Sequence, residues 1–421
     1  MGVRAGIVVT GTEVLTGRVI DRNGPWLAEQ LRAAGVDVGR LVVVGDRPVD
    51  LAAALRHLRP DHDLVITSGG LGPTADDLTA RVVGDVQGRP CRLDEPLRQR
   101  IAARVEELSR RRSWRGDPEA MAAGVAKQAE VPGGAHVLEP VGTAPGLVVP
   151  PAEGRDGPPV VVLPGPPSEL RGMWPAALAA PAVQAVLAGA VPLLEDTIRL
   201  WGALEADLAA TLRRIEPLDG LEVGTCLRDG ELEIVTRYAP SARPVLDLLR
   251  RTVLADFAAT VMSADGRDVD DLVAAALDAR GWTVATGESC TGGLLGARLT
   301  ARAGASARVL GGVDAYANAA KTGLLGVPAA LIEAHGAVSP PVAAALADGA
   351  RQAFGARVGV GVTGVAGPGG GSADKPVGTV HLAVVTPAGR YERALLLPGD
   401  REQVRQRTVV AAMHALRVAL G

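Results

Sequence analysis

The sequence of 421 residues contains few aromatic residues, few lysines and few cysteines. Five Trp, three Tyr and two Phe make up only 2% of it, so its cores must be built from many small aliphatic contacts. Cys91, Cys226 and Cys290 show neither the pairing of a disulfide framework nor the spacing of a zinc site. We therefore expect a fold that is stabilised by packed layers of helices and sheets.

The sequence also lacks the features that direct a chain to membranes, secretion or nucleic acids. No charge-free run of about eighteen apolar residues is present, and the first residues do not resemble a signal peptide. The net charge is −3, and both signs are interspersed, so there is no basic field that could hold a nucleic-acid backbone. These observations predict a cytoplasmic protein without a membrane or nucleic-acid partner.

Lysine is the rarest of the charged residues. Of the 44 basic residues, only Lys127, Lys321 and Lys375 are lysines, and the others are arginines. Of these two cations, only lysine loses its proton readily when it is buried, whereas arginine stays charged. Codon bias and chance are the alternative explanation, but each lysine is a candidate for a role that arginine cannot fill.

The length predicts about two or three domains. Residues 1–172 alternate continuous apolar runs with amphipathic segments, which indicates a parallel sheet covered on both faces. Residues 173–265 form a compact strand-helix-strand-helix pattern, and residues 268–421 again combine strands and helices. We predict an α/β protein with two mixed or parallel three-layer α/β domains, joined by a small α+β domain.

The segment "ATGESCTGGLL", residues 285–295, lies between a predicted strand and a helix expected to begin near Leu294. A Walker-type phosphate loop is excluded because no lysine follows the glycines, and the spacing for dinucleotide binding is absent. A serine at such a turn, Ser289, can be a nucleophile beside backbone N–H groups that stabilise an oxyanion. Alternatively, Ser289 is a turn residue that caps the helix.

No histidine is an obvious partner for Ser289, but Lys321 lies in the segment "DAYANAAKTGLLG". A buried lysine can be neutral enough to accept the proton of a hydroxyl group, which would give a Ser–Lys pair suited to amide hydrolysis. The alternative is an ordinary surface lysine. The residues alone leave both interpretations open.

Several motifs of the carboxyl-terminal segment occur together in a recognisable order. "ESCTGG", "GGVDAYANAAKTGLLGV", "HGAVS", "VTGVAGPGGG", "KPVGTVHLA" and "PGDR" resemble the carboxyl-terminal domain of the CinA family and cover nearly all of residues 268–421. The resemblance implies a nicotinamide-nucleotide amidase, which hydrolyses the carboxamide of nicotinamide mononucleotide to nicotinate mononucleotide and ammonia. It implies no cofactor and no metal for this reaction.

The resemblance also assigns roles to individual residues. Ser289 matches the nucleophile and Lys321 the general base, with Tyr316 close to both. Substrate contacts are implied for a further set of residues: Thr291, Gly292 and Gly293 near the acyl oxyanion, Thr363, Gly364 and Gly367 on the opposite side of the pocket, and Arg401 at the nucleotide phosphate.

Other residues near these motifs receive structural interpretations. Glu288 either orients the loop or is an ordinary acid at a helix start. His335 is expected to be structural and Lys375 to anchor its own glycine-rich loop. Gly287 stands where the family usually has Ala, and we expect it to loosen the turn.

A second candidate site lies in the amino-terminal segment. "TSGGLGPTADD" follows a predicted strand and leads to a helix expected near Asp77, so its glycines and helix start can receive a phosphate group. Asp76 and Asp77 are either ligands of a divalent metal or the cap and first-turn acid of that helix. The predicted nucleotide site comprises Glu13, Gly69, Gly70, Gly72 and Thr74, and the predicted metal ligands are Asp46, Asp76 and Asp77.

Residues 1–172 resemble the amino-terminal domain of the CinA family, which has the fold of molybdopterin-binding proteins, and residues 173–265 resemble its small KH-like domain. This resemblance implies hydrolysis of the pyrophosphate of ADP-ribose with a divalent metal such as Mg²⁺. Asp21 and Arg22 replace the first Asn and the Thr of the usual N-T-N motif, which changes the substrate contacts expected there.

Two other functions remain as alternatives. One is a catalytically silent, nucleotide-binding adaptor in competence or DNA-damage response, and the other is a molybdopterin-binding protein. The expected small-molecule partners are nicotinamide mononucleotide and ADP-ribose, and the aliphatic composition makes a homodimer the expected assembly.

Overall fold

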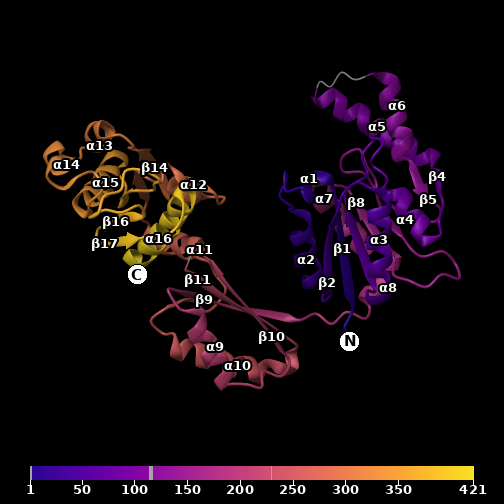
Figure 1. Ribbon diagram of the computed structural model, residues 1–421, viewed down its shortest axis with the longest axis horizontal. Coiled ribbons are helices and arrows are strands. Elements are labelled where there is room, and N and C mark those ends of the chain that lie inside the picture. Colours follow the sequence, from indigo (N-terminus) through magenta and orange to yellow (C-terminus); the bar gives the residue numbers. More distant parts are fainter. Residues whose placement is uncertain (1, 113–116, 229) are drawn as a thin grey trace. The chain divides into compact units, whose positions relative to one another are not determined.

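The computed structural model describes residues 2–112, 117–228 and 230–421. The chain is divided by its internal contacts into two compact units, Met1–Leu194 and Glu195–Gly421 (Figure 1). The first unit extends past the predicted boundary at residue 172, which lies inside helix α7 (Pro167–Ala179). Both units combine helices and strands, which confirms the predicted α/β class.

The first unit is built on a six-stranded sheet with strand order β2-β1-β3-β8-β7-β6. Its strands are β1 (Arg4–Thr10), β2 (Asp37–Val44), β3 (Leu64–Ser68), β6 (His136–Leu138), β7 (Gly146–Val149) and β8 (Val160–Leu163). The first four in this order are parallel, and β7 and β6 run antiparallel to their neighbours. The central strands are continuous runs of Val, Ile and Leu because both faces of the sheet are buried.

Helices cover both faces of this sheet (Figure 1). One face packs against α2 (Asn23–Ala33), α7 and α8 (Pro181–Leu187), and the other against α3 (Pro48–Leu58), α4 (Thr79–Gln87), α5 (Glu95–Arg112) and α6 (Pro118–Gln128). The remaining elements are α1 (Thr12–Leu15), a 3₁₀ turn at Arg59–Asp61, and the paired strands β4 (Cys91–Leu93) and β5 (Glu130–Pro132). The unit is therefore a three-layer structure, as predicted.

The second unit contains a small four-stranded sheet with strand order β10-β11-β9-β12. Its elements are β9 (Leu194–Trp201), α9 (Glu205–Arg214), β10 (Leu221–Arg228), β11 (Glu231–Tyr238), a 3₁₀ turn at Pro240–Ala242, α10 (Arg243–Asp256) and β12 (Val261–Ser263). Both helices pack against one face of the sheet through a shared apolar cluster (Figure 1). This is the small α+β element that the sequence predicted.

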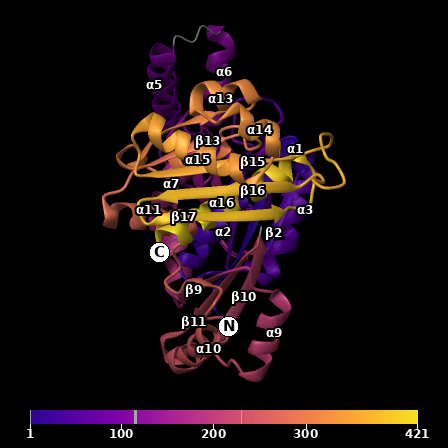
Figure 2. The ribbon, with the colours of Figure 1, turned by 90° about the vertical axis from the view of Figure 1, so that its left-hand side faces the viewer.

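The same unit contains a five-stranded sheet with strand order β14-β13-β15-β16-β17. Its strands are β13 (Val284–Glu288), β14 (Val309–Asp314), β15 (Val358–Gly364), β16 (Thr379–Thr386) and β17 (Gly389–Leu396). The first three in this order are parallel, whereas β16 and β17 are antiparallel and lie side by side in Figure 2. The carboxyl ends of β13 and β15 therefore meet at one edge of the sheet.

Helices again cover both faces of the five-stranded sheet. On one face lie α11 (Val269–Arg280), α12 (Leu294–Thr300) and α16 (Arg401–Leu420). On the other lie α13 (Asn318–Leu325), α14 (Ala329–His335) and α15 (Pro340–Phe354). A 3₁₀ turn at Ala305–Ala307 connects α12 to β14. Gly359 and Gly361 of β15 leave no room for a Cβ because backbone carbonyls of α15 lie directly against them. This close approach fixes α15, and the loop before it, next to the end of β15.

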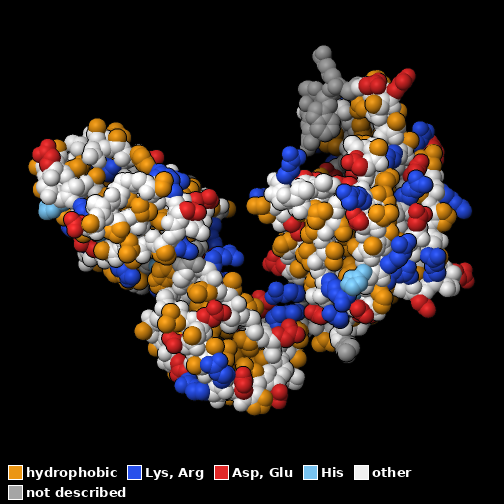
Figure 3. Space-filling view, viewed as in Figure 1, with side chains coloured by type: hydrophobic (Ala, Val, Ile, Leu, Met, Phe, Trp, Pro, Cys, Tyr) orange, Lys and Arg blue, Asp and Glu red, His pale blue; other side chains and the backbone are white. Residues whose placement is uncertain are grey.

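The hydrophobicity of the helices and the surface charges are two further properties of the molecule. No helix in the described parts of the chain is both long and apolar enough to cross a membrane. On the face drawn in Figure 3, basic and acidic side chains are interspersed over both units, as the distribution of charges along the sequence predicts.

Candidate active site

Ser289 directly follows β13 and begins the turn that leads into α12. Its backbone N–H donates to the Val362 carbonyl of β15 at 3.0 Å, and the residue is 8% exposed. Gly292 and Gly293 have φ angles of 56° and 83°, which L side chains adopt only at a cost. The glycines thus turn the chain within a few residues, and α12 begins at Leu294, as predicted.

Glu288, not Ser289, binds the start of α12. Its buried carboxylate accepts the backbone N–H groups of Leu295 at 3.0 Å and Gly296 at 2.8 Å. These are among the first N–H groups of a helix, which have no acceptor within the helix itself. Within the described residues Ser289 makes no such bond and Gly293 is the cap residue of α12, so the helix-cap alternative for Ser289 is wrong. Gly287 lies inside β13, where a Cβ would be 2.6 Å from the Leu346 carbonyl, and therefore does not loosen the turn.

Lys321 lies in α13 and is 1% exposed, so the surface-lysine alternative is also wrong. Its Nζ donates to the carbonyls of Ala315 at 2.9 Å and Tyr316 at 2.8 Å. Burial lowers the pKa of the Lys321 ammonium, and the Cys290 and Asp314 side chains oppose this shift. The site therefore contains a lysine whose neutral form is more accessible than that of a lysine in water.

A short chain of hydrogen bonds connects the residues next to Ser289 with Lys321. The Ala315 N–H donates to the Glu288 carbonyl at 2.7 Å, and the Ala315 carbonyl accepts from Lys321 Nζ. Ser289 is the next residue after Glu288. The predicted nucleophile and base are thus anchored to one pair of strand ends, although no hydrogen bond joins Ser289 Oγ to Lys321 Nζ in the described residues.

Arg401 connects two parts of the predicted pocket. It is the first residue of α16, and its guanidinium donates to the Tyr316 hydroxyl and the Gly367 carbonyl, each at 2.7 Å. Asp400 and Gln403 fix this helix start by a capping box. Tyr316 is 58% exposed, so the predicted phosphate ligand Arg401 and the predicted neighbour of the catalytic pair meet at an open surface.

Arg405 was not among the predicted site residues. It lies one helical turn after Arg401 and donates to the carbonyls of Cys290 at 3.1 Å and Thr291 at 2.8 Å. Two arginines four residues apart on a helix face the same side, and this spacing was the available signal. Arg405 holds the loop that follows Ser289.

The remaining predicted contacts are mostly buried. The Thr291 side chain is fully buried, and its Oγ1 has no partner in the described residues. The Thr363 hydroxyl donates to the Ala337 carbonyl at 2.8 Å, which ties the end of β15 to the loop before α15. A Cβ on Gly364 would lie 3.1 Å from Cys290 Sγ. Burial raises the pKa of the Cys290 thiol to about 12, which disfavours the thiolate, the nucleophilic form of cysteine.

The glycine-rich loop after β15 is anchored as predicted for Lys375. Lys375 Nζ donates to the His335 carbonyl at the end of α14, at 2.8 Å. Gly367 in this loop has a φ of 85° and presents its carbonyl to Arg401. His335 therefore contributes through its backbone, which agrees with the structural role expected for it.

The amino-terminal loop differs from its prediction in one respect. Helix α4 begins at Thr79, and Asp77 instead accepts the Thr74 backbone N–H at 3.0 Å and its hydroxyl at 2.6 Å. The Thr74 hydroxyl also contacts Asp76 at 2.5 Å, and this hydrogen bond lowers the pKa of the Asp76 carboxyl. Neither aspartate caps α4. Lys127 Nζ donates to the carbonyls of Gly72 and Thr74 and thereby holds this loop.

Two of the three predicted metal ligands line the same small pocket. Asp46 and Asp76 lie there with Thr10 and Gly70, whereas Asp77 does not line it. Among the described residues, no group of three or more His, Cys, Asp or Glu side chains could hold a metal ion. The three predicted aspartates are therefore not brought together as one cluster in the described residues.

The other predicted residues of this site have identifiable neighbours. Gly69 and Gly70 have φ angles of 108° and 67°, and a Cβ on either would collide with the threonines around them. Glu13 lies exposed in the short helix α1. Asp21 accepts the N–H groups of Asn23 and Gly24 at 2.9 and 3.0 Å, so at this departure from the family motif it stabilises the start of α2.

Comparisons with known proteins cover the whole chain. Residues 267–420 match the model described as the CinA C-terminal domain, and residues 6–185 match the model described as a probable molybdopterin binding domain. A "CinA-like protein" of Mycobacterium sp. (strain JLS) is 54% identical over 426 residues, which cover 100% of this chain and 99% of the relative.

Two further proteins have similar sequences. A "CinA-like protein" of Mycobacterium tuberculosis (strain ATCC 25177 / H37Ra) is 50% identical, covering 99% of this chain and 97% of the relative. A solved structure, described as competence/damage inducible protein CihA from Agrobacterium tumefaciens, is 41% identical with a TM-score of 0.35, covering 38% of this chain and 99% of that one.

Proposed function

The chain belongs to the CinA family, and on that premise we propose that its carboxyl-terminal domain is a nicotinamide-nucleotide amidase. The proposed reaction is hydrolysis of the carboxamide of nicotinamide mononucleotide to nicotinate mononucleotide and ammonia. The observation that carries this proposal is the buried Lys321 beside the turn of Ser289. A lysine in such surroundings is difficult to explain as a simple surface cation.

The hydrogen bonds of Lys321 support its assignment as the base. A neutral amine has two N–H bonds and one lone pair, and the two carbonyls of Ala315 and Tyr316 take up the two N–H bonds. The lone pair is then free to accept a proton. Because burial lowers the pKa of Lys321, this neutral form is more accessible than it is for a lysine in water.

We assign the first chemical step to Ser289. Its Oγ attacks the carboxamide carbon while Lys321 accepts the hydroxyl proton; the C–N bond then breaks, and the returned proton leaves with ammonia. Water hydrolyses the resulting acyl ester and releases the nicotinate carboxylate. Among the described residues, the Thr291 and Gly293 N–H groups have no internal acceptor, and they are our candidate donors to the oxyanion.

The test measures ammonia and nicotinate mononucleotide formed from nicotinamide mononucleotide by wild type and Ser289→Ala, with a chelator present. We expect turnover in the wild type and none in the variant. Cys290→Ala is the matched control because it changes the neighbouring residue of the same turn and should retain most of the activity. Equal activity of wild type and Ser289→Ala would overturn the proposal, and an inactive wild type would favour the adaptor.

A second candidate function concerns the amino-terminal domain, which we propose hydrolyses the pyrophosphate of ADP-ribose with a divalent metal. The supporting observation is the pocket lined by Asp46, Asp76 and Gly70. Mg²⁺ is usually bound by one or two carboxylates together with substrate phosphates and water, and two aspartates fit this pattern. A bound metal would neutralise charge on the pyrophosphate.

Calorimetric titration with ADP-ribose and magnesium tests this second function. We expect binding in the wild type and weaker binding in Asp46→Asn and Asp76→Asn. Absence of binding, together with binding of molybdopterin, would support the alternative function of this fold.

A further inference from the structure

A cavity that is lined by none of the residues of the two candidate sites lies within the second unit. It has a volume of about 330 Å³, which is within the range of small-molecule sites. Its walls come from the end of β9 and the loop at 259–260 on one side, and from β17 and the later turns of α16 on the other. The small α+β element and the carboxyl-terminal domain thus build it together.

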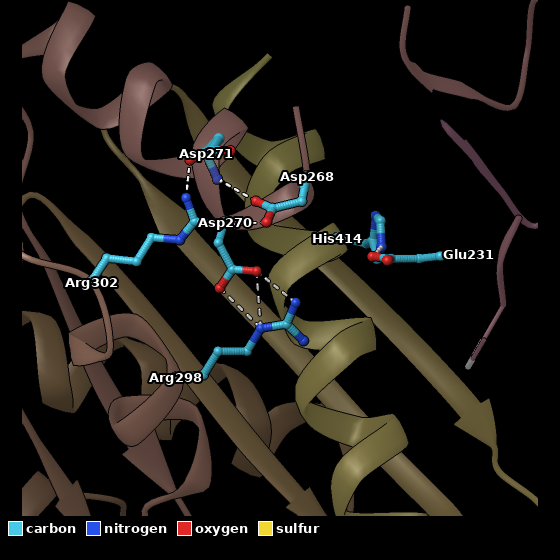
Figure 4. A network of polar contacts seen from close by, with 7 residues as sticks. All are labelled: Glu231, Asp268, Asp270, Asp271, Arg298, Arg302 and His414. Carbon is cyan, nitrogen blue, oxygen red and sulfur yellow. Dashed lines mark hydrogen bonds and ion pairs between the residues drawn. The ribbon is translucent and has the colours of Figure 1, made fainter. Parts of the chain in front are cut away.

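Trp201 and His414 form the inner contact between these two elements. Their rings stack with centroids 3.7 Å apart and an angle of 9° between the planes. His414 is 2% exposed, and its Nε2 lies 2.6 Å from a carboxylate oxygen of Glu231 (Figure 4). The other ring nitrogen, Nδ1, is buried without a hydrogen-bond partner in the described residues.

Two arginines line the same cavity. Arg393 donates to the Tyr391 hydroxyl at 3.2 Å. Arg417 is half-buried, and its Nε is buried without a partner among the residues that the structure describes. None of the described residues that line the cavity is acidic. Two guanidinium groups at one cavity, without a carboxylate among the described lining residues, would attract an anion.

We propose that this cavity is a binding site for a small phosphate-bearing ligand. Arginine suits this role because its planar group of N–H donors matches the oxygens of a phosphate. Free phosphate and a nucleoside monophosphate share this chemistry.

The experiment is isothermal titration of the full chain with inorganic phosphate and, separately, with adenosine monophosphate. In Arg417→Gln and Arg393→Gln we expect at least a tenfold weaker affinity, or one binding site fewer, than in the wild type. Arg390→Gln is the matched control because Arg390 lies on the same strand outside the cavity. Phosphate binding that is lost in Arg401→Gln would be assigned to the candidate active site instead.

A second variant fills the cavity and keeps the charges of Arg393 and Arg417. Ala259 is exposed and lines the cavity, so Ala259→Trp should block it without disturbing a core. Binding of the nucleotide alone, or of phosphate alone, would identify the source of the ligand. The proposal is overturned if neither probe binds to the wild type, or if the arginine variants and Ala259→Trp bind like the wild type. Because the readout is binding, an inactive amidase would not affect the result.

Discussion

The two candidate sites use lysine in the same way but in different surroundings. Lys127 holds the amino-terminal glycine loop through the carbonyls of Gly72 and Thr74, and Lys321 binds the carbonyls of two consecutive residues near Ser289. Lys127 is half-buried, whereas Lys321 is 1% exposed and its pKa is lowered by burial. Burial, and not the hydrogen-bond pattern, thus distinguishes a candidate base from a structural anchor.

The largest expected difference between these lysines is in amidase activity. Replacing Lys321 by Met removes the base and should reduce ammonia release by roughly 10⁴-fold or more, as is found when one member of a catalytic set is removed. Lys127→Met should leave ammonia release unchanged because it alters only the amino-terminal loop. Steady-state kinetics of the two variants, with circular dichroism to check folding, compares them directly. Similar activities of the two variants would contradict the assignment of Lys321 as the base.

The burial of Lys321 also predicts a pH dependence. The base must be neutral, so kcat/KM should rise with pH through the lowered pKa of Lys321 and level off below the ordinary lysine value of about 10.4. Between the lowered and the ordinary value the unfolded chain binds more protons, so stability should also rise with pH there. A pH–rate profile checks the first statement. A plateau reached only near pH 10.4 would contradict it.

A smaller difference, in the free energy of unfolding, is expected when the acids of the two loops are replaced. Glu288 is buried and accepts two backbone N–H groups of α12, so Glu288→Gln should destabilise the carboxyl-terminal domain by about 2 kcal/mol. The NH₂ group of the new amide would be a donor that faces the backbone N–H donors of Leu295 and Gly296. The measurement is urea unfolding followed by circular dichroism, with Glu402→Gln, an exposed residue of α16, as the control.

The smallest effect is expected for the matching change in the amino-terminal loop. Asp77 is only partly buried and binds Thr74, so Asp77→Asn keeps an acceptor and should cost about 1 kcal/mol or less. The same urea experiment measures it. A loss as large as that of Glu288→Gln would mean that the two loops are held with similar strength.

The sequence predicted the local structure of both loops better than their long-range contacts. The start of α12 at Leu294 followed from glycines that terminate one element and allow the next to begin. The start of α4 was placed two residues early because Asp77 binds Thr74 in the turn and does not enter the helix. A local pattern cannot tell which of two nearby acceptors an aspartate satisfies.

Contacts between distant segments were the main omission. Arg405 reaches carbonyls more than a hundred residues earlier in the chain, and a carbonyl leaves no signature in the sequence. The burial of Lys321 likewise depends on how α13 packs against α15, although the scarcity of lysine pointed to this residue. Composition therefore identified the residue, and only the fold explained its environment.

The small number of lysines also makes the protein a selective target for reagents that acylate amines. Each of its three side-chain amines donates to a backbone carbonyl, and each reports on a different loop. Lys127 and Lys375 are partly exposed and should be modified first, whereas Lys321 should react only when its domain opens. The order of labelling by mass spectrometry would thus follow local unfolding of each loop without any introduced probe.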